Sequence, residues 1–323
     1  MKTVLVTGGA GFIGSNLIRE LLSGGQYRVA VVDNMDSSYE VAYKEDNLRP
    51  FDGHENFIFY KKDILDFAGL KKIFEKEKPE YVVHLAAKTD TRKAVADPYI
   101  YEAINIKGTI NLLELAKDYG VKNFVFASSS SVYGNTASVP FKEDDAHSFA
   151  ISPYGATKRS GEFFIYTYYH NFGLNSVCLR FFNAYGENNR PDMVPYIWTD
   201  KILRGEQIEI SGGGSRKRDY TYVGDTVGAI IKALELKDAG FEILNIGYGR
   251  PYSLRELLAA LEKVIGTKAK VKERPSHAAS VEETCADIKK AKLILGWEPE
   301  VSLEDGLSRL VIWFKQNRMK NFK

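Results

Sequence analysis

The chain contains few cysteines, carries almost no net charge and has no long apolar run. Its 323 residues include only two cysteines, Cys178 and Cys285, too few for a disulfide framework or a cysteine-rich metal site. Lys and Arg number 44 against 42 Asp and Glu, so the formal net charge of +2 creates no strong field for nucleic acid or membranes. No apolar run approaches transmembrane length, and no signal peptide precedes the first strand-like segment. We therefore expect a cytoplasmic protein with no metal site, no nucleic-acid partner and no membrane span.

Strand-like and helix-like patterns alternate through the first half of the chain. Aliphatic and β-branched runs occur at 2–7, 28–32, 57–60, 81–87 and 123–127. Helical spacing of apolar residues occurs between them at 12–22, 70–76 and 99–119. This alternation is typical of a parallel sheet with helices on both faces. Within the apolar runs, we expect His84 to be a hydrogen-bonded core residue and Cys178 to be an inert core thiol.

A glycine-rich turn separates the first strand-like run from the first helix. Gly8, Gly11 and Gly14 follow Lys2–Thr7, and the helical pattern begins at Phe12. In a dinucleotide-binding turn, such glycines permit a tight turn, close approach of a pyrophosphate and close packing of helix on strand. The helix N-terminus then offers free N–H groups to the phosphates. Taken alone, the glycines also fit an ordinary strand-to-helix turn.

Acidic residues follow the second and third runs and favour the dinucleotide. Asp33 lies nineteen residues beyond Gly14, the distance at which a carboxylate accepts hydrogen bonds from the adenosine ribose. An aspartate there repels a 2′-phosphate, which favours NAD over NADP. We place the adenine beside Asp63, for which a helix N-cap is the alternative. The sequence therefore predicts an α/β fold of the Rossmann type, a doubly wound parallel sheet that binds NAD.

A serine cluster and a Tyr–Lys pair indicate chemistry. Ser128 to Ser131 follow the fifth run directly, where parallel sheets bind ligands, although serine clusters are commonly loops or caps. Tyr154 and Lys158 are four residues apart and share one helical face. An ammonium near a phenol favours the phenolate and lowers a tyrosine pKa from near 10. The alternative is a pair of surface side chains, but the nucleotide-binding context favours catalysis.

These motifs resemble the extended short-chain dehydrogenase/reductase family over essentially the whole chain. The resemblance implies an NAD-binding domain over 1–180, to which parts of about 217–250 return, and a substrate-binding lobe over 181–323. It also implies that Tyr154 is the acid/base, that Lys158 binds the nicotinamide ribose, and that Ser129 orients the hydroxyl being oxidised. The residues it places around the cofactor are Gly8, Gly11, Phe12, Ile13, Gly14, Asp33, Asn34, Asp63, Ile64, Leu85, Ala86, Ala87, Asn105, Tyr154, Lys158 and Phe181.

Within this family, the serine cluster separates the reactions. Nucleotide-sugar 4,6-dehydratases place Asp-Glu after the serine or threonine, and decarboxylases place Glu directly before Val-Tyr-Gly. Ser130 and Ser131 occupy those positions here and cannot act as carboxylate acids or bases. The pattern therefore resembles a 4-epimerase. The segment 190–193 (Arg-Pro-Asp-Met) resembles UDP-glucuronate 4-epimerases in particular, whereas Asn183 is more typical of neutral-sugar epimerases.

The resemblance thus implies a 4-epimerase that interconverts UDP-glucuronate and UDP-galacturonate. The alternatives are a UDP-glucose or UDP-N-acetylglucosamine 4-epimerase, and a non-catalytic NAD-binding protein. In the family, arginines matching Arg218 and Arg274 clamp the diphosphate, and Arg190 contacts the diphosphate or the carboxylate; solvated surface residues are the other interpretation. The implied substrate-binding residues are Ser129, Ser130, Ser131, Asn183, Arg190, Val194, Arg218 and Arg274. The family also pairs the helices 99–119 and 152–171 across a two-fold axis, which predicts a homodimer.

Overall fold

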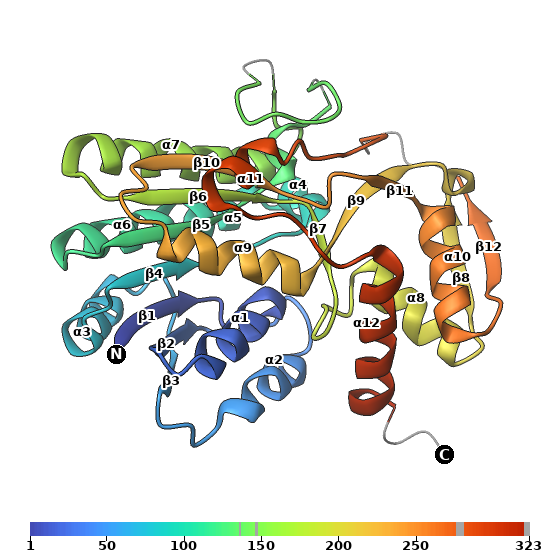
Figure 1. Ribbon diagram of the computed structural model, residues 1–323, viewed down its shortest axis with the longest axis horizontal. Coiled ribbons are helices and arrows are strands. Elements are labelled where there is room, and N and C mark those ends of the chain that lie inside the picture. The colour runs from blue at the N-terminus through green and yellow to red at the C-terminus, as the bar shows by residue number, and fades with distance from the viewer. Residues whose placement is uncertain (136, 146–147, 276–280, 320–323) are drawn as a thin grey trace.

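A parallel sheet of seven strands forms the centre of the computed structural model, which describes residues 1–135, 137–145, 148–275 and 281–319 (Figure 1). The strand order is β10-β6-β5-β4-β1-β2-β3, and every neighbouring pair is parallel. The strands are β1 (Lys2–Thr7), β2 (Tyr27–Asp33), β3 (Phe57–Lys61), β4 (Tyr81–His84), β5 (Asn123–Ser129), β6 (Ser176–Phe181) and β10 (Phe241–Ile246). The predicted doubly wound fold is confirmed.

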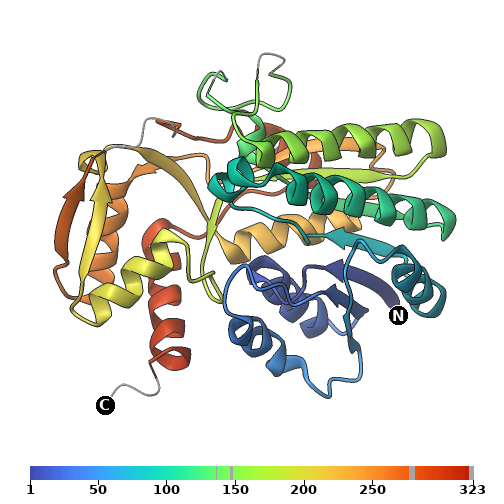
Figure 2. The ribbon, with the colours of Figure 1, turned by 180° about the vertical axis from the view of Figure 1, so that it is seen from behind.

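Helices cover both faces of this sheet. Val4 and Val6 of β1 pack into the core shared with α1 (Phe12–Ser23) and α9 (Val223–Glu235). Leu5 points to the opposite face and its core. The helices there are α3 (Phe67–Glu77), α6 (Gly108–Asp118) and α7 (Pro153–Phe172), of which α6 and α7 lie in front in Figure 2. Because both faces are covered, the strands are predominantly apolar, as the sequence pattern indicated.

Two elements differ from the sequence prediction. The helix expected over 99–119 consists of α5 (Pro98–Glu102), a π-helical segment (Ala103–Lys107) and α6. The fourth strand, expected to reach Ala87, ends at His84. The backbone beyond it passes close to the turn after β1, since a Cβ added at Gly8 would lie 2.7 Å from the backbone nitrogen of Ala86.

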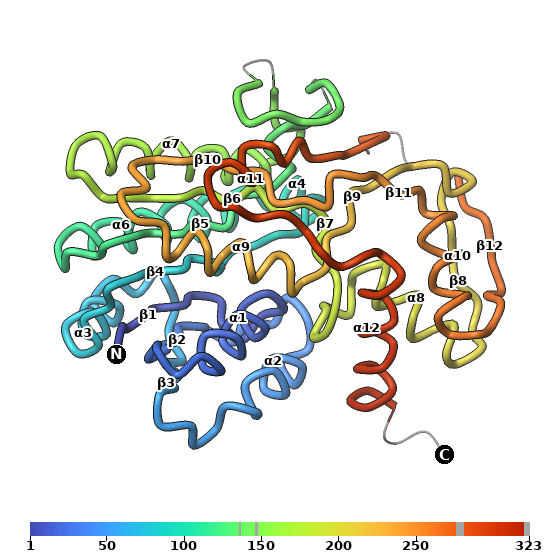
Figure 3. The backbone as a smooth tube through the Cα atoms, in the orientation of Figure 1, coloured from blue at the N-terminus to red at the C-terminus, as the bar shows by residue number. Residues whose placement is uncertain are grey.

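A smaller lobe lies beyond the carboxyl ends of the large sheet (Figure 3). It contains a sheet of β7 (Asn183–Tyr185), β9 (Lys217–Tyr222) and β11 (Pro251–Ser253), and a pair of β8 (Gln207–Ser211) and β12 (Lys270–Arg274). The α-helices of the chain not yet named, in either part of the molecule, are α2 (Val41–Leu48), α4 (Thr91–Ala96), α8 (Val194–Leu203), α10 (Leu254–Ile265), α11 (Lys289–Leu295) and α12 (Leu303–Asn317). The chain returns from β9 through α9 to β10 of the large sheet. The division into two domains at residue 180 stays a prediction.

The two buried groups expected to be structural are confirmed as such. The ring nitrogens of His84 lie 2.7 Å from Thr7 Oγ1 and 3.0 Å from Thr109 Oγ1. Burial lowers the pKa of His84 to about 3, so the ring is neutral at physiological pH. Cys178 is fully buried, and burial raises the pKa of its thiol, which makes it a poor nucleophile. Within the described ranges, no helix combines the length and apolarity that a membrane crossing requires.

Candidate active site

A cleft of about 1300 Å³ lies at the carboxyl ends of the strands of the large sheet and reaches into the small lobe. It brings together most of the residues selected from the sequence. Those that line it are Gly8, Gly11, Phe12, Ile13, Gly14, Asp33, Asn34, Asp63, Ile64, Leu85, Ala86, Ala87, Ser129, Ser130, Ser131, Tyr154, Lys158, Phe181, Asn183, Arg190 and Arg218. A site assembled from six strand ends and the second lobe is typical of ligand binding in open α/β sheets.

Three selected residues do not line the cleft. Asn105 is buried in the π-helical segment, where its side chain donates to the carbonyl of Lys88 and accepts from the N–H of Lys88. It therefore fixes the backbone beyond β4. Val194 begins α8, and its predecessor Met193 lines the cleft instead. Arg274 ends β12 in the small lobe and is ion-paired there with Glu209.

The glycine turn and Asp33 fit a dinucleotide. Gly11 is the N-cap of α1 and, among the described residues, no side chain caps this helix, so its N-terminal N–H groups are available to a pyrophosphate. A Cβ at Gly14 would lie 2.4 Å from the carbonyl oxygen of Gly8, so the turn requires glycine. Asp33 ends β2 with only 6% of its surface exposed and lines the cleft. The residues present therefore fit NAD, whose ribose Asp33 would hold.

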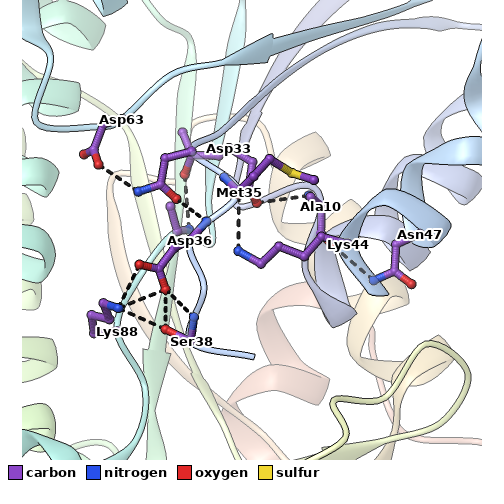
Figure 4. A network of polar contacts seen from close by, with 12 residues as sticks. Ala10, Asp33, Met35, Asp36, Ser38, Lys44, Asn47, Asp63 and Lys88 are labelled. Carbon is purple, nitrogen blue, oxygen red and sulfur yellow. Dashed lines mark hydrogen bonds and ion pairs between the residues drawn. The ribbon is translucent and has the colours of Figure 1, made fainter. Parts of the chain in front are cut away.

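Asp33 is surrounded by donors from three segments (Figure 4). Its carboxylate accepts hydrogen bonds from the backbone N–H groups of Ala10 at 3.2 Å and Met35 at 2.9 Å. The ammonium of Lys44 lies 3.4 Å from the same carboxylate. Lys44 was not selected from the sequence, because the stretch after Asp33 has no pattern that fixes which side chains of α2 face the cleft.

An ion pair across the cleft was also not anticipated. Lys88 Nζ lies 2.9 and 3.0 Å from the two carboxylate oxygens of Asp36 and 2.9 Å from Ser38 Oγ (Figure 4). Burial opposes ionisation of Asp36, but the hydrogen bonds from Ser38 and Lys88 outweigh it and lower its pKa to about 2. The position of Lys88, directly after a predicted strand end, was the signal that could have identified it.

Helix α7 presents Tyr154 and Lys158 to the cleft, as their spacing predicted. The helix begins with Ser152, whose Oγ accepts the N–H of Gly155 at 3.1 Å, and with Pro153 at the first helical position. Ser129 lines the same cleft and favours the ionised form of the Tyr154 phenol, which opposes the effect of burial on the pKa of Tyr154. A buried phenol beside a serine at a strand end can exchange a proton with a bound hydroxyl group.

The electrostatics around Tyr154 differ from the expectation. Burial raises the pKa of Tyr154, opposed by Ser129 and the charge of Arg190. Lys158 does not lower the pKa of Tyr154 here, because its ammonium donates to the carbonyl of Ala127 at 2.7 Å and lies over the ring of Phe126. Burial lowers the pKa of Lys158 to about 7. Helical spacing identifies a shared face but not the direction of a long, flexible side chain.

The two cleft arginines selected from the sequence, Arg190 and Arg218, have different surroundings. Arg190 is bidentate to Asp192, with Nε 3.0 Å from Oδ1, and its remaining terminal nitrogen donates to Thr89. Its charge is therefore already balanced within the protein. Arg218 donates to the backbone carbonyl of Lys217 at 2.7 Å, and no described carboxylate forms an ion pair with it. Arg218 is the cation of this pair that remains available to an anionic ligand.

A buried ion pair lies behind the catalytic face. Glu162 and Arg180 form two contacts of 2.8 Å, and both side chains are at most 1% exposed. The hydroxyl of Ser128 donates to Glu162 Oε1 at 2.6 Å. The pair joins α7, β5 and β6 directly beneath Ser129, Tyr154 and Lys158. Glu162 follows Lys158 by four residues, a continuation of the Tyr154–Lys158 spacing that could have identified it.

Comparisons with known proteins agree with this architecture. The family model described as GDP-mannose 4,6 dehydratase matches residues 5–310. The UDP-glucuronate 4-epimerase of Thermodesulfobacterium geofontis is 44% identical over 318 residues, covering 98% of this chain and 97% of that protein. A crystal structure of UDP-glucuronic acid 4-epimerase from Bacillus cereus, in complex with UDP-glucuronic acid and NAD, is 35% identical with a TM-score of 0.91, covering 97% and 99%.

A UDP-glucose 4-epimerase from Thermotoga maritima, crystallised with UDP-glucose, is 38% identical with a TM-score of 0.90 and covers 98% of this chain and 99% of that one. The relatives thus include enzymes for acidic and for neutral sugars, all aligned over nearly their full length. The chain belongs to the GDP-mannose 4,6 dehydratase family of extended short-chain dehydrogenases/reductases.

Proposed function

We propose that this protein is an NAD-dependent 4-epimerase that interconverts UDP-glucuronate and UDP-galacturonate. The observation that carries the proposal is the composition of the cleft, where Ser129, Tyr154 and Lys158 lie together with the residues that fit NAD. Ser130 and Ser131 line the same wall at the positions where family dehydratases and decarboxylases have carboxylates. This favours epimerisation over the reaction in the family model's name.

The proposed chemistry needs one proton carrier and one hydride carrier. Tyr154 takes the proton of the C4 hydroxyl, which Ser129 orients, as the hydride leaves C4, and returns the proton to the same oxygen when the ketone is reduced. NAD, when bound, would supply the acceptor of the C4 hydride and, in its reduced form, the donor for reduction of the opposite face of the sugar. The C5 proton of the 4-keto uronate is acidic because C5 is adjacent to the ketone, so the wall around it must lack a general base near C5. Ser130 and Ser131 meet that requirement.

We assign the substrate's carboxylate to the serines and its diphosphate to Arg218. Hydrogen bonds to a charged acceptor contribute about 1.5–3 kcal/mol each, so two or three serine donors support a strong preference. Arg190 is a weaker candidate for either group, because Asp192 already balances its charge. Arg218 has no such partner among the described carboxylates, and an arginine fork suits phosphate oxygens.

A neutral UDP-sugar 4-epimerase is the second candidate. Asn183 lines the cleft and is more typical of neutral-sugar epimerases, and the Thermotoga maritima relative is a UDP-glucose 4-epimerase. A non-catalytic NAD-binding protein is less well supported, because it has no use for the group of Ser129, Tyr154 and Lys158.

A panel of UDP-sugars tests the assignment. Purified protein is given UDP-glucuronate, UDP-glucose and UDP-N-acetylglucosamine in turn, and the C4 epimer is quantified. We expect kcat/KM for UDP-glucuronate to exceed that for UDP-glucose by at least tenfold, about 1.4 kcal/mol, because the serine donors are left poorly paired by a neutral CH₂OH group. Ser131→Ala should reduce this ratio. Equal or inverted constants would leave the neutral-sugar epimerase, and no epimer from any sugar would favour the non-catalytic protein.

We also propose a homodimer, a cytoplasmic location and a boundary between two domains near residue 180. The free thiols of Cys178 and Cys285 suit a reducing compartment. The dimer rests on exposed aromatic side chains and is developed in the Discussion.

A further inference from the structure

Three hydrogen-bond donors converge on one carboxylate at the ribose end of the cleft. They are the backbone N–H groups of Ala10 and Met35 and the ammonium of Lys44, all directed at Asp33 (Figure 4). They come from the glycine turn, the loop after β2 and helix α2. Asp33 and Lys44 both line the cleft, so the cluster borders the space available to a ligand.

Lys44 depends on Asp33 for its charge balance. Its side chain is only 9% exposed, and Asp33 is the one carboxylate that forms an ion pair with it among the described residues. The other contact of the ammonium is the ring of Tyr39, 5.5 Å from the nitrogen to the ring centre. Removal of the Asp33 charge would therefore leave a buried cation without an anionic partner.

The same three donors match what a phosphate group requires. Two backbone N–H groups and a lysine ammonium are donors found in anion sites, and here they surround the carboxylate of Asp33. The protein thus fills an anion-binding cradle with its own side chain. NAD, which has no 2′-phosphate, is compatible with that arrangement. The 2′-phosphate of NADP would be repelled by the negative charge of Asp33.

We propose that Lys44, with the N–H groups of Ala10 and Met35, forms a latent phosphate site that Asp33 fills, so that Lys44 is the cation that would hold a 2′-phosphate once the Asp33 carboxylate is removed. Replacement of Asp33 by a small neutral residue opens the cradle, and Lys44 then binds the 2′-phosphate of NADP. The inference concerns cofactor choice alone and does not depend on which sugar is epimerised.

Two other lysines of the cleft, Lys62 and Lys88, have carboxylates of their own. Lys62 is 3.2 Å from Asp66, and Lys88 is paired with Asp36. Neither is an ion-pair partner of Asp33 among the described residues. Lys62, which lines the cleft near Asp63, is therefore the matched control: it is a nearby lysine that does not contact the Asp33 carboxylate.

Titration calorimetry of cofactor-free protein with NAD and with NADP tests the proposal. The variants are Asp33→Ser, Lys44→Met, the double variant and Asp33→Ser/Lys62→Met. We expect Asp33→Ser to bind NADP at least about tenfold more tightly than the wild type, because a charge-assisted contact replaces a repulsion. Lys44→Met should abolish that gain in the Asp33→Ser background and produce no gain alone. Lys62→Met should leave the gain intact, and the gain should shrink as salt increases.

Two results would overturn the proposal: an undiminished NADP gain in the double variant, or no gain in Asp33→Ser protein whose thermal unfolding shows it to be folded. If Asp33→Ser does not fold, Asp33→Ala also removes the charge and vacates the carboxylate position, and its NADP affinity must rise in a Lys44-dependent way. NAD binding by the wild type is measured separately. If the wild type did not bind NAD, the proposed function would be contradicted. If it binds NAD but the Asp33 variant shows no increase in NADP affinity, only the latent phosphate site is contradicted.

Discussion

Tyr154 is the single side chain on which the proposed reaction depends most. Replacement by phenylalanine removes one oxygen and keeps the ring that packs with Ala94 and Tyr101. We expect kcat to fall by roughly 10²–10⁴-fold, the range typical of general acid–base catalysis, while NAD affinity and thermal stability stay close to those of the wild type. Steady-state kinetics and calorimetry measure the two effects.

Tyr166→Phe is the matched control for this prediction. Tyr166 lies on the same helix with 48% of its surface exposed, away from the cleft lining, so its hydroxyl should be dispensable. If Tyr154→Phe retains near-normal turnover while Tyr166→Phe is also active, Tyr154 is not the acid/base.

At the scale of single residues, the sequence predicted which residues line the cleft better than it predicted which partners their side chains contact. Asp33, Ser129 and Tyr154 were selected because strand ends and helical spacing decide where a residue lies, and all three line the cleft. The sequence did not reveal that Lys158 donates to a backbone carbonyl or that Lys44 faces Asp33. Those contacts depend on the rotamers of long side chains and on the orientation of a short helix, which no periodic pattern encodes.

At the scale of elements, the buried Glu162–Arg180 pair joins helix α7 to strands β5 and β6 beneath the catalytic residues. Removing Glu162 leaves the buried Arg180 without a carboxylate partner among the described residues, whereas removing Arg180 leaves Glu162 paired with Arg159, 3.1 Å away. We expect Glu162→Leu to reduce the free energy of unfolding by about 3–5 kcal/mol and Arg180→Met to reduce it by less, with the double variant much less destabilised than the sum. Urea unfolding of the four proteins measures this as a double-mutant cycle.

The exposed pair Lys263–Glu304 provides the control, because surface ion pairs contribute only about 0–1 kcal/mol. Additive losses for Glu162 and Arg180 would show that the two side chains do not act as a unit. Helix α7 itself was predictable from its cap and periodicity, whereas the break in the helix expected over 99–119 was not. The π-helical turn there arises where Asn105 binds the backbone of Lys88, a tertiary contact that the helical pattern does not contain.

At the scale of the whole molecule, the alternation of strands and helices predicted the large sheet because each strand is buried on both faces and therefore apolar. The small lobe was implied only by family resemblance. Its short strands, such as β7 and β11, carry no alternation long enough to identify them. Family resemblance implied two diphosphate clamps, Arg218 and Arg274, and of these two the fold places only Arg218 in the cleft.

The outer face of the molecule also carries an unexplained set of exposed aromatic side chains. Phe163 and Phe172 on α7 are 59% and 56% exposed, and Tyr99 on α5 is 83% exposed. An apolar group of this kind is costly in water and is typical of a protein–protein contact. It lies on the helices that family resemblance pairs across a two-fold axis, so we expect an isologous homodimer.

A charge placed in this contact should separate the subunits. Phe163→Lys puts two like charges near the two-fold axis, and Arg159, which lies 5.2 Å from the ring of Phe163, adds a further repulsion. We expect the wild type to sediment as a dimer at micromolar concentration and Phe163→Lys as a monomer with an unchanged circular dichroism spectrum. Ile312→Lys, at a position 56% exposed on α12, is the control and should stay dimeric. A monomeric wild type, or a Phe163→Lys variant that remains dimeric, would contradict the assignment of this face.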